Sequence, residues 1–184
     1  MTGMSEWMQE LSLLAAADFH GRRIVGALAT SGADRMPHNR MVVLRQMDTF
    51  SNSIWTTTDA RSEKAAQMLF NPFAELVVWA QTERTQFRVR GPVEVIGNGS
   101  GYQEMWAGLT DRDRAMFSWP MPGSPCVAGV KLIETVAANT PPAETFLVFV
   151  LRATEAEALE LNEFPHRRRI WRKENDWKME RINP

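Results

Sequence analysis

Alternating and continuous runs of apolar residues divide most of the chain into strand-like segments. The clearest alternation spans residues 86–97, where Phe87 and Val89 fall on one face and Gln86 and Arg88 on the other. Further strands are predicted over residues 23–30, 38–45, 54–57, 73–80 and 145–152, and a terminal hairpin over residues 167–173 and 177–182. Short turns join most of these segments, which is typical of an antiparallel sheet.

Helical spacing replaces this alternation near the N-terminus and again between residues 100 and 117. Trp7 and Leu11 belong to the apolar face of a first helix, with Ser5 as its cap and a break near Gly21. Two short helices are predicted between residues 100 and 117. We expect all three helices to lie outside the sheet and to pack against it.

A further helix is predicted to begin after Asp59 or Ser62, because both residue types are good helix caps. It ends at Asn71, since the residue before a proline avoids the helical region of backbone space. Its buried face is predicted to consist of Ala65, Met68 and Leu69. The start of this helix therefore lies beside Arg61, directly after a strand.

The order of the elements predicts the fold class. Strands outnumber helices, and the chain has no regular alternation of strand and helix that would indicate a parallel sheet. An antiparallel β-barrel with peripheral helices, of the α+β class, fits this pattern best. The 184 residues contain no repeats or linkers, so a single domain over residues 1–184 is expected.

Composition restricts the possible partners. The chain has 21 Lys and Arg against 22 Asp and Glu, so no general basic field favours nucleic acid or an anionic membrane. Cys126 is the single cysteine, which excludes an internal disulfide, and the three histidines are too far apart for zinc spacing, so no metal site is expected. The chain has neither a positive leader nor an apolar run of about 20 residues, and a cytoplasmic location is therefore expected.

The turn TDARSEK, residues 58–64, is the strongest chemical feature. A helix N-terminus exposes unpaired N–H groups and the positive end of the helix dipole, so Arg61, Ser62 and Lys64 would form an anion site there. Phosphate is the natural ligand of such a site. The alternative is that Arg61, Glu63 and Lys64 form an ordinary solvated first turn with salt bridges.

Other polar residues are ambiguous when they are taken singly. Gln86 has an amide that fits the edge of a heterocycle, and Arg40 lies on a strand face where it is paired to an acid or awaits a ligand. The basic run 166–173 resembles a nucleic-acid patch, but strand geometry sends alternate side chains to opposite faces. We therefore expect no nucleic-acid partner, and salt-dependent binding of oligonucleotides would be the sign of one.

Read together, four motifs resemble the pyridoxamine 5'-phosphate oxidase-like family, and more closely its related FMN-binding split-barrel branch. The motifs are RMVVLR at 40–45, TTDARSEK at 57–64 followed by NP, TQFRVRG at 85–91, and the ending ENDWKMERINP. The likeness covers most of the chain from about residue 22, and the order and spacing are more specific than any single motif. The resemblance implies a six-stranded antiparallel split β-barrel of Greek-key topology with peripheral helices.

The resemblance also implies a homodimer with FMN in a groove between the subunits. The flavin would lie along the strand that carries Arg40, Met41, Val42, Val43, Leu44 and Arg45. Thr56 and Thr57 would approach the ribityl phosphate, and Arg61, Ser62 and Lys64 would hold the phosphate itself. Gln86 would contact the ring, and Arg168 would reach the flavin from the partner chain. The family has Ser-Arg-Lys at the phosphate turn whereas this chain has Arg-Ser-Glu-Lys, so Arg61 would supply the charge lost at Glu63.

The substrate side departs from the family. The resemblance places Tyr102 and His166 near the substrate, with Arg45 in place of a lysine, but Trp106 and Phe164 stand where two arginines are expected. Each missing cation costs a phosphorylated substrate charge-assisted hydrogen bonds worth about 1.5–3 kcal/mol. The predicted function is therefore an FMN-dependent oxidoreductase that acts on a less anionic small molecule. The alternative is a flavin-binding or flavin reductase-like protein without pyridoxamine-phosphate oxidase activity.

Overall fold

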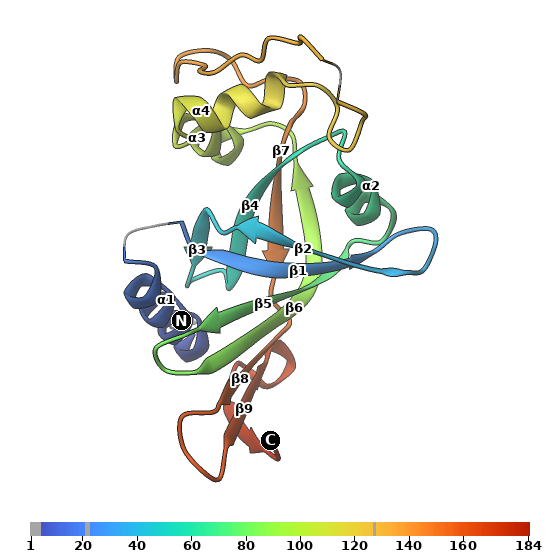
Figure 1. The fold of residues 1–184 in the computed structure, drawn as a ribbon. Coiled ribbons are helices and arrows are strands. Elements are labelled where there is room, and N and C mark those ends of the chain that lie inside the picture. The colour runs from blue at the N-terminus through green and yellow to red at the C-terminus, as the bar shows by residue number, and fades with distance from the viewer. Residues whose placement is uncertain (1–4, 21–22, 127) are drawn as a thin grey trace.

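The computed structural model describes residues 5–20, 23–126 and 128–184, and its strands form one strongly curled antiparallel sheet (Figure 1). The ten strands are β1 (Val25–Ser31), β2 (Pro37–Val43), β3 (Gln46–Asp48), β4 (Ser53–Asp59), β5 (Phe73–Ala80), β6 (Thr85–Ile96), β7 (Phe146–Arg152), β8 (Glu155–Glu160), β9 (Arg167–Arg172) and β10 (Met179–Ile182). The helices are α1 (Glu6–Phe19), α2 (Glu63–Phe70), α3 (Ser100–Ala107), α4 (Asp111–Ala115), and the 3-10 turns η1 (Met116–Ser118) and η2 (Lys173–Asn175). The predicted antiparallel barrel of the α+β class is confirmed, although the strands number more than six.

The long strand β6 holds the two parts of the sheet together. Its first half pairs with β5 and β8, and its second half pairs with β7, which in turn pairs with β4. Gly91 lies where β6 changes partner, and a Cβ atom there would stand 2.0 Å from the carbonyl oxygen of Arg152. The close approach of two backbones therefore explains the glycine in this strand.

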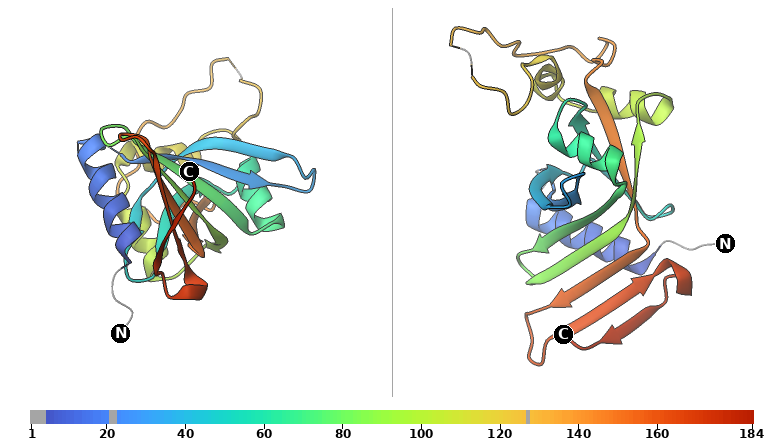
Figure 2. Two further views of the ribbon diagram at one scale, coloured as in Figure 1. Left: turned by 90° about the horizontal axis from the view of Figure 1, so that it is seen from below. Right: turned by 90° about the vertical axis from the view of Figure 1, so that its right-hand side faces the viewer.

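The strand β8 is missing from the sequence-based prediction. Its sequence EAEALE lacks the β-branched and aromatic residues that usually indicate a strand. Ion pairs across the sheet compensate, since Glu155 pairs with Arg90 on β6 and with Arg172 on β9. β8, β9 and β10 form an arm at the opposite end of the sheet from β2 (Figures 1 and 2).

Two apolar clusters form the core. The larger one fills the barrel and is covered by α1, whose Trp7 and Leu11 are fully buried. The smaller one joins α3 and η1 to β7 through Trp106, Phe117 and Phe146. The predicted first helix is confirmed with Ser5 at its N-cap position, but the Ser5 side chain makes no capping hydrogen bond; Gly21, the predicted break, lies outside the described residues.

The second predicted helix is confirmed as α2, with Ser62 before its first residue and Asn71 after its last. One position of its predicted buried face is wrong, because Leu69 is 64% exposed. Gln67 is buried in its place, and its Oε1 accepts hydrogen bonds from Thr30 and Arg40. A buried amide with two partners can replace an apolar residue at little cost. No helix among the described residues is long and apolar enough to cross a membrane.

Candidate functional site

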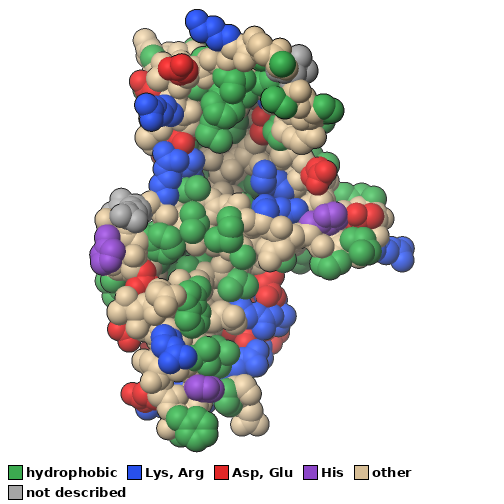
Figure 3. Space-filling view, in the orientation of Figure 1, with side chains coloured by type: hydrophobic (Ala, Val, Ile, Leu, Met, Phe, Trp, Pro, Cys, Tyr) green, Lys and Arg blue, Asp and Glu red, His purple; other side chains and the backbone are tan. Residues whose placement is uncertain are grey.

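A cavity of about 450 Å³ lies between strand β2 and the helical end of the molecule. β2 is the last strand of the sheet order, so one edge of its backbone has no partner strand among the described residues and can bind a ligand. The sheet side of the cavity consists of Met41, Val42, Val43, Thr57 and Thr58. In the space-filling view, basic side chains lie on both sides of the hollow below α3 and α4 (Figure 3).

The opposite wall of the cavity comes from η1 and the loop after it. Its members are Met116, Phe117, Trp119, Pro120 and Pro122. Trp119 is held by two contacts, because its indole N–H donates to the carbonyl of Ile133 over 2.7 Å and its own carbonyl accepts from Arg61 over 2.9 Å. This wall is apolar and aromatic, and it faces the unpaired edge of β2.

Lys64 brings an unpaired positive charge to the cavity. It belongs to the first turn of α2, is half-buried, and makes no hydrogen bond or ion pair with any described residue. Burial lowers the pKa of Lys64 from its usual value, the neighbouring charge of Arg40 lowers it further, and Asp59 opposes both effects. An anion bound here would relieve the cost of burying this ammonium group.

Arg40 is the second cation near the start of α2. Its guanidinium donates to the hydroxyl of Thr30 and, over 2.7 Å, to Oε1 of Gln67, so uncharged partners hold it without neutralising it. Burial lowers the pKa of Arg40, and Glu63 partly opposes this. The two cations Arg40 and Lys64 therefore produce a positive region beside the N-terminal N–H groups of α2, where an anion is favoured.

Arg61 and Ser62 are engaged within their own turn. The Arg61 guanidinium binds both carboxylate oxygens of Asp59 at 3.0 and 2.7 Å, which raises the pKa of Arg61. The hydroxyl of Ser62 donates to the carbonyl of Asp59 over 2.7 Å and lies 3.1 Å from the hydroxyl of Thr58. The phosphate roles inferred for Arg61 and Ser62 from the sequence stay predictions. The Ser62 hydroxyl would have to leave the Asp59 carbonyl to donate to a phosphate, whereas Nη1 of Arg61 makes no hydrogen bond with the described residues.

The remaining residues of the predicted flavin strand differ in their positions. Met41, Val42, Val43 and Arg45 line the cavity, whereas Leu44 points into the barrel core. Thr57 lines the cavity as well. Thr56 is buried behind it, and its hydroxyl donates to the carbonyl of Val43 over 2.7 Å.

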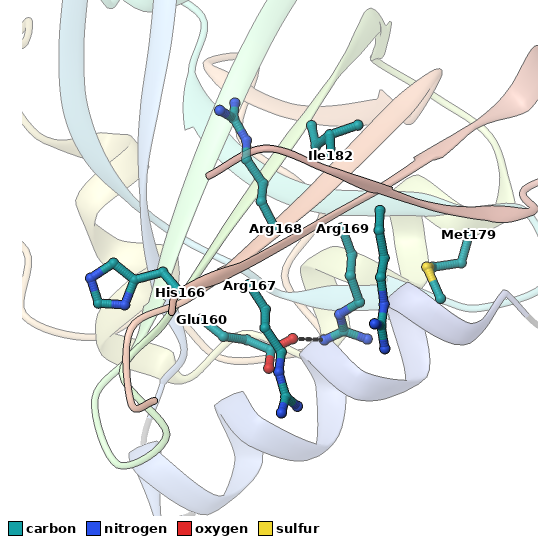
Figure 4. Close-up of a pocket in the computed structure, with 8 residues that line it drawn as sticks. Glu160, His166, Arg167, Arg168, Arg169, Met179 and Ile182 are labelled. Atoms are coloured by element: carbon teal, nitrogen blue, oxygen red, sulfur yellow. Dashed lines mark ion pairs between the residues drawn. The ribbon is translucent and has the colours of Figure 1, made fainter. Parts of the chain in front are cut away.

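Gln86 and Arg168 lie away from the cavity, on the outer face of the sheet. Gln86 on β6 pairs with Leu159 on β8, which pairs with Arg168 on β9. Five strand steps separate β9 from β2, roughly 24 Å along the sheet. Arg168 and Arg169 project from opposite sides of β9 (Figure 4); Arg168 pairs with Glu157 and Arg169 with Glu160 and with Glu10 of α1. One chain therefore does not bring Arg168 to the cavity.

Tyr102 and His166, the predicted substrate-side residues, do not line the cavity either. Tyr102 is in the smaller core cluster, where its hydroxyl donates to the carbonyl of Phe146 over 3.1 Å and burial raises its pKa. His166 is exposed on the β8–β9 loop, and Phe164 beside it is 92% exposed. Both roles stay predictions.

Sequence reasoning missed several residues of the cavity. Asp59, Asp113 and Arg23 line it, together with the apolar wall from Met116 to Pro122. Asp59 was detectable, since it stands two residues before Arg61 and a short side chain there readily binds it. Arg23 and Asp113 are 90 residues apart, and no local pattern connects them.

Comparisons with known proteins identify the family of the chain. The family model described as pyridoxamine 5'-phosphate oxidase, FMN-binding domain, matches residues 4–97, which include β2, β4 and α2. The chain belongs to this family. Pyridoxine/pyridoxamine 5'-phosphate oxidase 2 of Arabidopsis thaliana is 32% identical over 133 residues, which are 68% of this chain and 67% of that relative. The pyridoxine/pyridoxamine 5'-phosphate oxidase of Cupriavidus metallidurans is 34% identical, and the match covers 61% of this chain and about half (51%) of that enzyme.

A solved structure of the pyridoxamine 5'-phosphate oxidase-related family extends the likeness to the whole fold. The FMN-binding protein from Nostoc punctiforme has a TM-score of 0.86 and 26% identity, covering 99% of this chain and 100% of that one. The matched region of the family is its FMN-binding domain, so FMN is the cofactor of this protein. The residues present fit that cofactor, because Lys64 and Arg40 offer a phosphate two positive charges and β2 offers a flavin ring an unpaired strand edge.

Proposed function

We propose that this protein is an FMN-dependent oxidoreductase that acts on a small organic molecule. The unpaired Lys64 carries the proposal, because a half-buried cation at a helix start, next to the edge strand of an FMN-binding domain, suits a bound phosphate. FMN, when bound, supplies the redox chemistry by accepting electrons from the substrate. The chain's own residues bind and orient the two molecules and exclude water.

Each part of the cavity has one task in this proposal. Lys64 and Arg40 bind the phosphate, assisted by the N–H groups at the start of α2. The backbone of Met41, Val42 and Val43 aligns the ring along the edge of β2. The apolar wall around Trp119 lies opposite and covers the substrate, which keeps water from the reacting atoms.

We infer that the working form is a homodimer. The distance along the sheet between β9 and β2 supports this, because Arg168 needs a second chain if it is to serve the flavin at all. The same applies to Gln86, which shares a row of the outer sheet face with Arg168. The outer face would then be the contact surface between the two copies.

The first experiment tests cofactor binding and turnover separately. The purified protein should be yellow, or should gain flavin absorption bands when FMN is added, and a protein that stays colourless would refute the proposal. Anaerobic addition of candidate reductants, including NAD(P)H and the B6 vitamers, should then bleach the flavin, and air should restore it. Bleaching by none of them would favour a flavin-binding protein without turnover.

A mixing experiment tests the shared site. Lys64→Met and Arg168→Gln should each weaken FMN binding in the pure variants. Subunit exchange between the two variants should restore about half of the normal sites in the heterodimers, since one of the two sites then carries neither substitution. The matched control is Arg167→Gln, an exposed arginine of the same strand, which should bind FMN normally. No recovery on mixing would mean that each chain builds its site alone.

A further inference from the structure

The end of the cavity away from Lys64 contains a second charged group, made of two arginines and one aspartate. Arg23 grips both oxygens of the Asp113 carboxylate, with its two terminal nitrogens at 2.7 and 2.6 Å. Arg45 reaches the same carboxylate with a single contact of 3.4 Å. Asp113 is therefore committed mainly to Arg23, which leaves Arg45 weakly paired.

Arg45 is the more buried of the two arginines. Its side chain is 18% exposed, compared with 49% for Arg23, and its Nε is buried without a hydrogen-bond partner among the described residues. Burial lowers the pKa of Arg45, the charge of Asp113 opposes this, and the like charge of Arg23 adds to the lowering. Glu104 lines a small neighbouring cavity with Arg45, but the two form no ion pair. Burying a guanidinium whose N–H donors lack partners costs free energy unless an anion accepts hydrogen bonds from them.

The charges at this end of the cavity limit what the anion can be. Two guanidinium groups share one carboxylate, so the group has a surplus of one positive charge. A second carboxylate would bring it to neutrality and would offer Arg45 the planar, two-oxygen partner that guanidinium prefers. A phosphate dianion would give the group a net negative charge, and its own charge would be repelled by the carboxylate of Asp113.

The wall beside Arg45 indicates the body of the ligand. Phe117 is almost fully buried, and Met116, Trp119 and the two prolines present apolar surface to the cavity. Flat apolar walls of this kind bind aromatic rings.

We propose that Arg45, which lies beside the Arg23–Asp113 pair, binds the carboxylate of the substrate, and that the substrate is an aromatic monocarboxylate. This inference rests on the proposed function and assigns to it a substrate class. Arg23 acts as the positioning residue, because it binds both oxygens of the Asp113 carboxylate and so keeps that carboxylate from pairing closely with Arg45. Lys64, with the charge of Arg40 near it, stays with the cofactor.

The test uses benzoate as the probe, with benzyl alcohol as its neutral counterpart and phenyl phosphate as its dianionic one. Binding is followed by the change in the flavin spectrum of the FMN-loaded protein and, independently, by calorimetry on the protein without added flavin. Benzoate should bind more tightly than either of the other two. Arg45→Gln should lower the affinity for benzoate by about tenfold or more, since a charge-assisted hydrogen bond is lost. The affinity for benzyl alcohol should be unchanged.

Two further variants separate this role from a structural one. Arg23→Gln should also weaken benzoate, because Asp113 is then free to pair with Arg45. Asp113→Asn should strengthen benzoate binding, whereas a purely structural aspartate predicts weaker binding. The matched control is Arg112→Gln, an exposed arginine of α4, which should change nothing. Thermal melts of every variant report whether it is folded.

Three outcomes would overturn the inference: benzoate affinity that is unchanged in Arg45→Gln, tighter binding of phenyl phosphate than of benzoate, or equal losses for benzoate and benzyl alcohol. Failure of the proposed function would look different. The protein would then bind no FMN, while calorimetry would still show benzoate binding that depends on Arg45.

Discussion

Replacement of Lys64 by methionine tests the cofactor site most directly. Methionine keeps the length of the side chain and its helix propensity but removes the charge. Lys64 makes no hydrogen bond or ion pair with the described residues, so its loss breaks no contact of the ligand-free protein. Folding stability should therefore stay the same or rise slightly, since burial of an unpaired ammonium group ends.

The size of the effect follows from the contact that Lys64 would make. A hydrogen bond between a charged donor and a phosphate oxygen contributes about 1.5–3 kcal/mol, which corresponds to roughly ten- to hundredfold in FMN affinity. Arg61→Gln should cost less, because the Arg61 guanidinium is already bound to Asp59 and to the carbonyl of Trp119. The loss on removing Lys64 should thus exceed the loss on removing Arg61.

Quenching of flavin fluorescence measures both affinities, and riboflavin serves as the matched ligand because it lacks the phosphate. Lys64→Met should lower the affinity for FMN by roughly ten- to hundredfold and leave the affinity for riboflavin unchanged. Equal losses for the two flavins would show that Lys64 contacts the ring or shapes the cavity. Unchanged FMN affinity would place the phosphate elsewhere.

Three further results are expected. Burial lowers the pKa of Lys64, and a bound phosphate would raise this pKa again. FMN affinity should therefore be highest below the lowered pKa and should fall as pH rises through it. Titrations above pH ~7, beyond the second phosphate pKa of about 6, should show this trend in the native protein and not in Lys64→Met. Gly91→Ala should lower the free energy of unfolding by about 2 kcal/mol or more in urea titrations, because its Cβ would overlap the carbonyl oxygen of Arg152. Arg114→Met should lower the free energy of unfolding by roughly 3 kcal/mol in the same assay, because this arginine is 2% exposed and donates to the carbonyls of Val136, Trp106 and Leu109. Arg112→Met should leave the free energy of unfolding almost unchanged.

Periodicity predicted the fold where side chains face a core on one side only. β6 is the best example, since its alternation of apolar and polar residues matches the observed burial along Thr85–Val93. β8 was not predicted because its outer face is stabilised by cross-strand ion pairs, and the arginines that form them lie on the neighbouring strands β6 and β9 rather than in the β8 sequence itself. A strand of Glu and Ala can be recognised only when its partners are known.

The candidate site was predictable to a similar degree. The motifs from Arg40 to Lys64 indicated a phosphate site, because strand ends and helix starts are local features that the sequence carries directly, and FMN followed from the resemblance of these motifs to the family. The roles within these motifs depend on contacts that only the structure shows, since Asp59 binds Arg61 and Lys64 has no hydrogen-bond or ion-pair partner among the described residues. The pairing of Arg23 with Asp113 depends on how the helical end folds back over β2, which no short window contains.

The origin of the two cavity walls bears on how such a protein changes its substrate during evolution. The cofactor side consists of sheet edge and the start of α2, which the barrel core holds in place. The opposite wall belongs to a short segment from Asp113 to Pro122, carried by the helical end. On the proposed function, mutations in that segment would alter which compound is oxidised without disturbing the flavin. Selection for a new substrate would therefore have a target of about ten residues in this segment, together with Arg23 and Arg45, and the rest of the barrel could stay as it is.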